Sequence, residues 1–272
     1  MKHVLNTRLL ALAAASALLL AGCGGSSSGE SNFADAELSQ SSASGRVIDG
    51  YVSGATVCYD ANDNLACDGS EKKVLSNGAG QYDLDALLGA NQLLAIGGQN
   101  VDSNSPNKLV LLAPGANAPI GSVRQITPLT TLFAVLAKNV KPSEFNDAQI
   151  VFNQLFGIPQ GISALTMDPI AAANNASSSQ ANRTAALAVQ KLTVQLANVV
   201  LGGIFLSGDD SAANQMQQYV SILAARTVFQ SGNFSLVSSA TIRQILTTAN
   251  SAEPSSELVS RIVQANGAIA QA

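Results

Sequence analysis

The chain has one histidine, His3, among its 272 residues, and it has no tryptophan. Because His3 lies in an N-terminal leader that we expect to be removed, the mature protein would contain no imidazole. That excludes catalysis by Ser-His-Asp or Cys-His groups, a histidine general base, and histidine-ligated zinc or haem.

Charge is also scarce, at 12% of residues, and positive charge is the scarcer sign. The chain has 14 Lys and Arg against 18 Asp and Glu, and loss of Lys2 and Arg8 with the leader would lower the basic count by two. An acidic protein repels a phosphate backbone, which excludes nucleic acid as a partner. A hydrophobic content of 47% favours a folded chain over a disordered one.

The leader, residues 1–22, has a basic start and an apolar run from Leu9 to Leu20 that is too short to span a bilayer. It ends in Leu20-Ala21-Gly22-Cys23, which resembles the lipobox of bacterial lipoproteins. The resemblance implies cleavage before Cys23, a diacylglycerol thioether on its sulfur and an acyl chain such as palmitate on its amine. Two or three buried acyl chains would hold the protein on a membrane. An ordinary secretory signal peptide with an incidental cysteine is the alternative.

Residues 23–45 predict a flexible tether after the lipidated cysteine. Between Gly24 and Gly45 there are eight serines and four glycines, with little that could be buried. Such a chain reaches roughly 25 Å, enough to hold a folded body clear of the head groups. Gly24, and not an aspartate, stands directly after Cys23. By resemblance to lipoproteins of double-membraned bacteria this indicates the outer membrane, on its periplasmic or its surface face.

Short alternating apolar runs between Gly, Asn and Asp clusters indicate an antiparallel β sandwich over residues 46–125. We expect strands near residues 47–48, 50–52, 55–59, 73–75, 81–84 and 93–96. Asn77-Gly78 and Gly80 tolerate positive φ and suit a hairpin between two of these strands.

The segments Gly45–Val57 and Ser76–Leu84 resemble transthyretin-like modules of bacterial surface proteins, in the carboxypeptidase-regulatory, Cna B-type and SdrD B-like group. The resemblance implies a stalk, a spacer or a binding surface, not an active site.

A twelve-residue loop, residues 60–71, lies between the expected strands at 55–59 and 73–75 and has the ligand spacing of an EF-hand. Oxygen-bearing side chains stand at positions 1, 3, 5, 9 and 12, and position 7 would offer its carbonyl; these residues are Asp60, Asn62, Asn64, Asp68, Glu71 and Ala66. Leu65 stands at position 6, where the EF-hand has glycine, so the turn there needs a different backbone or strain. The loop predicts weakly bound structural Ca²⁺, and a solvated Asx-rich turn is the alternative.

Cys58 and Cys67 bracket the first half of this loop. In an exported protein, two cysteines that remain after lipidation of the third predict one disulfide. A buried pair of free thiols is the alternative.

From residue 126 the apolar period changes to about 3.6, which predicts an all-α domain over residues 126–272. Thr127-Pro128 and Asp168-Pro169 each read as an N-cap followed by a first-turn proline. We expect three helices over about 128–138, 144–156 and 180–205. A fourth follows Asp209-Asp210 and has Met216, Val220, Leu223 and Thr227 on one face. A fifth contains Ile242, Ile245 and Leu246, and a last one is bounded by Pro254 and Gly267. Asp209-Asp210 suits a helix start better than an acid/base pair.

The expected protein is therefore α+β with two domains, an antiparallel β sandwich and an all-α domain, carried on an outer-membrane lipid anchor. We expect a non-enzymatic module for adhesion, matrix attachment or envelope assembly, whose partner is another envelope or extracellular protein or a polysaccharide. Two alternatives stay open. One is an accessory or hydrolytic enzyme that uses carboxylates of the helical domain on an envelope or extracellular polymer, and the other is a carrier with an apolar pocket among the helices.

Overall fold

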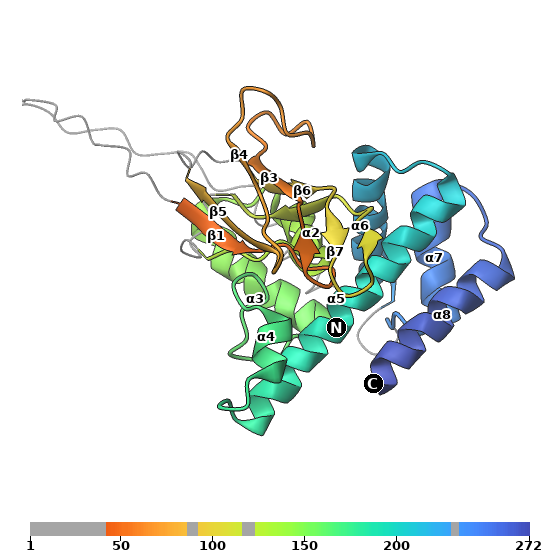
Figure 1. Ribbon diagram of the computed structural model, residues 1–272. Coiled ribbons are helices and arrows are strands. Elements are labelled where there is room, and N and C mark those ends of the chain that lie inside the picture. The colour runs from red at the N-terminus through yellow and green to blue at the C-terminus, as the bar shows by residue number, and fades with distance from the viewer. Residues whose placement is uncertain (1–41, 86–91, 116–122, 230–233) are drawn as a thin grey trace, which may run out of the picture. The chain divides into compact units, whose positions relative to one another are not determined.

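Antiparallel strands occupy the first part of the chain and helices the second (Figure 1). This computed structural model describes residues 42–85, 92–115, 123–229 and 234–272. The leader, Cys23 and most of the predicted tether lie outside these ranges. Residues Leu38–Ala272 form one compact unit. Below, the described residues up to 127 are the strand region, and those from 128 onwards are the helical region.

The described strands form three antiparallel sheets. Their bounds are β1 Ser42–Arg46, β2 Val52–Ser53, β3 Thr56–Tyr59, β4 Lys73–Leu75, β5 Gln81–Asp85, β6 Leu93–Ile96, β7 Gln99–Asn100, β8 Ser105–Pro106 and β9 Leu111–Ala113. The largest sheet has the order β4-β3-β6-β9, and the other two have the orders β1-β5 and β2-β7-β8. In the largest sheet, Val57 stands opposite Val74 on one side and opposite Ala95 on the other.

Strands β3 to β6 lie where the alternating pattern predicts them. The turn predicted at Asn77–Gly80 is present: Gly80 has a φ of +71° and its N–H donates to the Asn77 carbonyl at 2.9 Å. The predicted hairpin is wrong, because β4 pairs with β3 and β5 pairs with β1, in two different sheets. Positive φ is easily reached by glycine, because it has no Cβ.

Strand β1 corrects the predicted tether, which was expected to extend to residue 45. Ser42–Arg46 pairs with β5 along its whole length, and Ala43 is fully buried. Small side chains are needed here because the neighbouring backbone is close: a Cβ on Gly45 would lie 1.9 Å from the Arg124 carbonyl oxygen. The serines and glycine that suggested flexibility therefore permit close packing.

Seven α-helices and one short 3-10 helix make up the helical region, as far as it is described. Their bounds are α2 Pro128–Ala137, η2 Pro142–Glu144, α3 Phe145–Phe156, α4 Pro169–Asn174, α5 Gln180–Ser207, α6 Ala212–Val228, α7 Ser239–Asn250 and α8 Ser256–Gln271.

Helix ends follow their sequence signals closely. The Thr127 side chain accepts from the N–H of Thr130, and the Asp168 side chain accepts from the N–H groups of Ile170 and Ala171, so both predicted caps are confirmed. Helix α3 ends at Phe156, as predicted, and Gly157 after it takes the left-handed conformation that ends many helices.

Three details of the helix prediction are wrong. The N-cap of α6 is Ser211, while Asp209 accepts from the Ser211 N–H one step earlier. The buried face of α6 includes Tyr219 and Ile222, whereas Val220 is exposed. Met216 and Leu223 are only partly buried against the core, so the predicted apolar stripe is rotated away from the centre of the buried face. Helix α8 continues past Gly267 to Gln271.

One apolar core runs through both regions. A single cluster of buried side chains includes Val57 and Leu93 from the strands and Leu132, Leu196 and others from the helices. Helix α2 packs against β9, and the hydroxyl of Thr131 accepts from the Leu112 N–H at 2.8 Å. The sequence boundary expected near residue 125 therefore falls inside a continuous core.

Helix α5 is long and apolar enough to cross a membrane, judged by length and composition alone. It packs against α4, α6, α7 and α8, and nearly half of its apolar window is buried within the structure. Both features are typical of the central helix of a folded domain.

Candidate cation-binding loop

The loop of residues 60–71 leaves the end of β3 and returns to β4, beside the start of β6. Its first half is closed by a disulfide between Cys58 and Cys67, as predicted. Cys58 is fully buried in β3, so the bridge fixes the middle of the loop to the largest sheet.

Asp60, at position 1, organises the turn from its buried end. Its side chain has no exposed surface. Oδ1 accepts from the Asn64 N–H at 3.0 Å, and Oδ2 accepts from the Leu65 N–H at 3.0 Å and from Gln92 Nε2 at 3.1 Å. One carboxylate thus ties positions 5 and 6 of the loop to the start of β6.

The side chains at positions 3, 5 and 9 converge on one point. Asn62 Nδ2 and Asn64 Nδ2 each donate to Asp68 Oδ2 at 2.9 Å. The amide oxygens of the two asparagines are turned to the backbone, where they accept from the N–H groups two residues further on. The spacing therefore gathers these three side chains, with the amide nitrogens of the two asparagines, and not their oxygens, on Asp68.

Glu71, at position 12, closes the loop with both carboxylate oxygens. Oε1 accepts from the Ala61 N–H at 2.6 Å, and Oε2 accepts from the Asp68 N–H at 3.0 Å. Its carboxylate lies across the mouth of the loop, which is the place of the bidentate glutamate in an EF-hand loop.

Leu65 takes the backbone conformation that glycine would take at position 6. Its φ is +61°, and Asp63 has a φ of +56°. Such values are strained for residues with a side chain. The Leu65 side chain packs with Cys67 against a small cluster of Cys58, Leu94 and Leu112 on the largest sheet. Burial of the Leu65 side chain offsets the backbone strain. The signal for this packing in the sequence was a lone apolar residue in a polar loop.

Half of the proposed donor set of the loop is neutral. No group of three His, Cys, Asp or Glu side chains that could hold a metal occurs within the described ranges. The loop instead combines carboxylates with amide and carbonyl oxygens, which are the ligands that Ca²⁺ prefers over softer donors. Ala66 lies between the converging side chains and the disulfide, in the position whose carbonyl the spacing assigns to the cation.

Asp168 connects the two regions. Its Oδ2 forms an ion pair with Arg46 Nε at 3.0 Å and accepts from the Tyr51 hydroxyl at 2.9 Å, while its Oδ1 caps α4. The Arg46 guanidinium also lies over the Tyr51 ring, 4.7 Å from its centre. Burial, together with the hydrogen bond to Asp168, raises the pKa of Tyr51 to about 12, so its hydroxyl remains a donor at neutral pH.

Three further acidic side chains of the helical region have local structural partners. Asp209 accepts from the Ser211 N–H, Glu253 pairs with Arg243 at 2.6 Å, and Glu257 pairs with Arg261 at 2.7 Å. The Arg243 hydrogen bond lowers the pKa of Glu253. These contacts cap or connect helix ends and bring no two of these carboxylates together.

Comparisons of the chain with protein-family models, with curated proteins and with solved structures found no match.

Proposed function

We propose that this protein is a lipid-anchored outer-membrane protein whose folded body works by contact, as an adhesion, matrix-attachment or envelope-assembly module. The observation that carries the proposal is the use to which its carboxylates are put. Asp60 and Glu71 hold the loop, and Asp168 caps a helix while it pairs with the strand region. Groups with such structural partners stabilise a surface.

The anchor is proposed from the lipobox-like sequence at Cys23 and is tested on the full-length protein in its membrane. We expect intact-mass spectrometry to show a chain that begins at Cys23 and carries two or three acyl chains. The protein should fractionate with outer membranes, and Cys23→Ser should release it. An unmodified N-terminus on a soluble protein would overturn the anchor.

The contact function is tested by capture from intact cells with the anchor kept. We expect a protein or a polysaccharide to be enriched with the folded wild-type protein. The same protein or polysaccharide should be lost when the anchored protein is unfolded. The enzymatic alternative has its own signature, which is sustained turnover of an envelope polysaccharide that disappears when one acidic side chain of the helical region is neutralised. Such turnover would replace the contact function.

We also propose that the loop of residues 60–71 binds structural Ca²⁺ through Asp60, Asn62, Asn64, Asp68, Glu71 and the Ala66 carbonyl. Support comes from the closing carboxylate at position 12 and from the gathering of the side chains at positions 3, 5 and 9, whose asparagine oxygens would turn from the backbone to the cation. Lys72 and Lys73 stand beside the loop and are exposed, so they reduce the affinity for a cation. We therefore expect a dissociation constant of ~10⁻⁴–10⁻³ M.

Titration calorimetry and thermal melting test the cation. At a Ca²⁺ concentration ten times the dissociation constant, the free energy of unfolding should rise by about 1.4 kcal/mol, or about 3–6 °C in Tm. Glu71→Gln should remove this response, and Glu144→Gln, a matched change elsewhere on the chain, should keep it. A wild type with no binding heat and with the same Tm in EDTA would exclude the site.

The finer architecture is also a proposal. A transthyretin-like sandwich over residues 46–125, with a separate helical domain over 126–272, predicts two melting transitions. The continuous core favours one transition. Calorimetry of the intact protein separates these outcomes, because two independent domains would give two heat-absorption peaks.

A further inference from the structure

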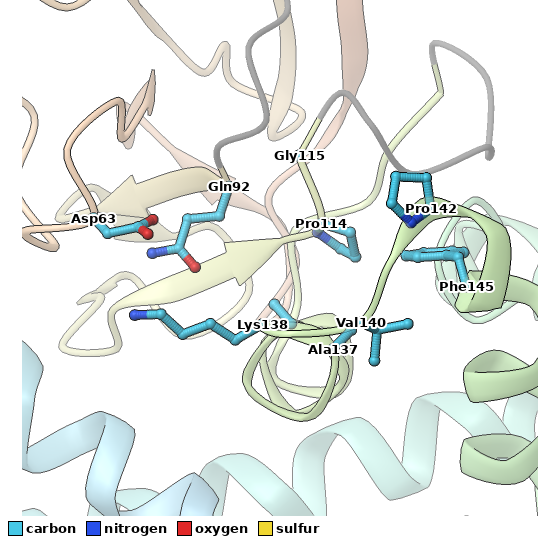
Figure 2. Close-up of a pocket in the computed structure, with 10 residues that line it drawn as sticks. Asp63, Gln92, Pro114, Gly115, Ala137, Lys138, Val140, Pro142 and Phe145 are labelled. Carbon is cyan, nitrogen blue, oxygen red and sulfur yellow. The ribbon is translucent and has the colours of Figure 1, made fainter. Parts of the chain in front are cut away.

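A pocket of about 290 Å³ lies between the cation loop, the start of β6 and the segment that follows α2 (Figure 2). Its two ends differ in chemistry. Asp63, Gln92 and Lys138 are grouped at one end, while Val140, Pro142 and Phe145 form the other. A ligand that fits this pocket must therefore be polar at one end and apolar at the other.

The polar end offers two opposite charges. Asp63 stands at position 4 of the loop, outside the proposed cation ligands, and its carboxylate points towards Gln92 (Figure 2). Within the described residues, neither Asp63 nor Lys138 takes part in an ion pair. Both side chains are exposed at the pocket and available to a ligand.

Gln92 adds a neutral acceptor between the two charges. Its Nε2 is held by Asp60 Oδ2 at 3.1 Å, which orients the amide. Its Oε1 is directed into the pocket (Figure 2). An ammonium group can accordingly be bound by a carboxylate and an amide oxygen together, with the Lys138 ammonium left for an anion.

The apolar end is rigid. Phe145 is almost fully buried and packs edge-on against Phe133, with ring centres 5.2 Å apart. Rigid aromatic packing fixes the floor of the pocket before a ligand arrives, which lowers the cost of binding. The volume is at the small end of the range for ligand sites, which limits the ligand to about the size of one amino acid.

We propose that this pocket binds a free α-amino acid with an apolar side chain. The ammonium group lies between Asp63 and Gln92 Oε1, the carboxylate lies on Lys138, and the apolar side chain lies against Val140, Pro142 and Phe145. The site goes beyond the proposed contact function.

The test uses three probes of one shape in calorimetric or NMR titrations of the intact protein. Phenylalanine carries both charges, phenethylamine only the positive charge, and 3-phenylpropionate only the negative charge. We expect phenylalanine to bind most tightly. Asp63→Asn should weaken phenylalanine and phenethylamine about fivefold and leave 3-phenylpropionate unchanged, since an exposed ion pair contributes at most that factor. Lys138→Gln should weaken phenylalanine and 3-phenylpropionate and leave phenethylamine unchanged.

Matched controls separate a binding role from a structural one. Asp147→Asn and Lys141→Gln change the same charges on nearby exposed residues that do not line the pocket, and they should alter no titration. Ala137→Phe should fill the pocket and abolish binding of all three probes. No saturable binding of phenylalanine up to ~20 mM, or an equal loss for all probes in each charge variant, would overturn the proposal. Binding of glycerophosphoethanolamine without binding of phenylalanine would assign the pocket to a lipid head group instead.

Discussion

The strand region and the helical region bury different kinds of polar side chain. The fully or almost fully buried polar groups of the strand region include two ionisable residues, Asp60 and Arg124. Those of the helical region are hydroxyls and amides, among them Gln215, Gln218 and Asn266. A buried charge must be matched by fixed partners, whereas an amide carries its own donor and acceptor. Within the described residues, the strand region therefore contains buried charge that fixed partners must hold, and the helical region contains buried polar groups that are neutral.

The buried amides connect elements that are distant in sequence. Gln215 of α6 donates through Nε2 to the Lys108 carbonyl at 3.0 Å and accepts through Oε1 from the Val110 N–H at 2.8 Å. Asn266 of α8 donates to the Leu236 carbonyl at 2.7 Å. Such bonds position helices without any charge, so pH and salt should have little effect on them.

The same glycine substitution in each region should give the largest contrast. In Gly45→Ala the new Cβ would lie 1.9 Å from the backbone oxygen of Arg124, whereas in Gly203→Ala it would lie 2.0 Å from the end of the Gln218 side chain. The Arg124 backbone cannot move away without breaking its hydrogen bond to Ser44 of β1. We expect a loss of about 3 kcal/mol or more for Gly45→Ala and of about 1 kcal/mol for Gly203→Ala, where alanine also improves the helix propensity.

Denaturant unfolding measures both changes, with Gly78→Ala as the control, because a Cβ there has nothing within 4 Å. A Gly45→Ala protein as stable as the control would show that β1 is not tightly held, and the original tether prediction would then extend through residue 45.

The disulfide should give the next largest effect. Cys58→Ala/Cys67→Ala removes the link that fixes the loop to β3, and a ring of this size contributes about 2–3 kcal/mol on the chain-entropy model. We expect Tm to fall, and we expect a reductant to lower the Tm of the wild type but not that of the double variant. Equal responses of the two proteins to the reductant would mean that the bridge does not stabilise the fold.

Local signals explain why much of this fold could be predicted from sequence. The caps at Thr127 and Asp168, the helix end before Gly157 and the spacing of oxygen-bearing side chains from Asp60 to Glu71 each act within a few residues. The residues that determine a cap or a turn lie within a few positions of it, because its hydrogen bonds are made to the neighbouring backbone. The loop and the disulfide were therefore predictable as a set of residues.

Features that depend on distant contacts could not be predicted in the same way. The serines of β1 resemble a linker until Arg124, far along the chain, is placed against Gly45. The face of α6 was misassigned because the helix packs against α2, α5 and α7 and buries its own amide Gln215, which bonds to the segment before β9, so an apolar stripe alone does not fix its rotation. The pocket at Lys138 is built from segments that no spacing rule connects.

The link between the regions should show an intermediate effect. Asp168→Ala removes the cap of α4, the ion pair with Arg46 and the acceptor for the Tyr51 hydroxyl. The cap contributes about 1 kcal/mol and the partly buried pair about as much again, so we expect a loss of about 2 kcal/mol. Glu253→Ala breaks an exposed ion pair within the helical region and should lower the stability less than Asp168→Ala does. Similar losses in urea unfolding would remove the distinction between an inter-regional and a surface pair.

The smallest effect concerns Asp49, which follows β1 and lies partly buried. Burial raises the pKa of its carboxyl from 3.8 to about 6. Burial, together with the charge of Asp49, raises the pKa of Tyr219 in α6. A raised pKa means that the folded state binds the proton more tightly than the unfolded state, so the penalty is absent below about pH 4, grows as pH rises towards 6 and is complete above it. Asp49→Asn should therefore stabilise the protein by about 1–2 kcal/mol at pH 7.5, and the stabilities of wild type and variant should converge near pH 4.

Urea unfolding between pH 4 and pH 7.5 measures the difference in stability, with the exposed Asp83→Asn as the control. A gain that does not depend on pH would show that the asparagine stabilises through a new hydrogen bond and that Asp49 carries no buried charge.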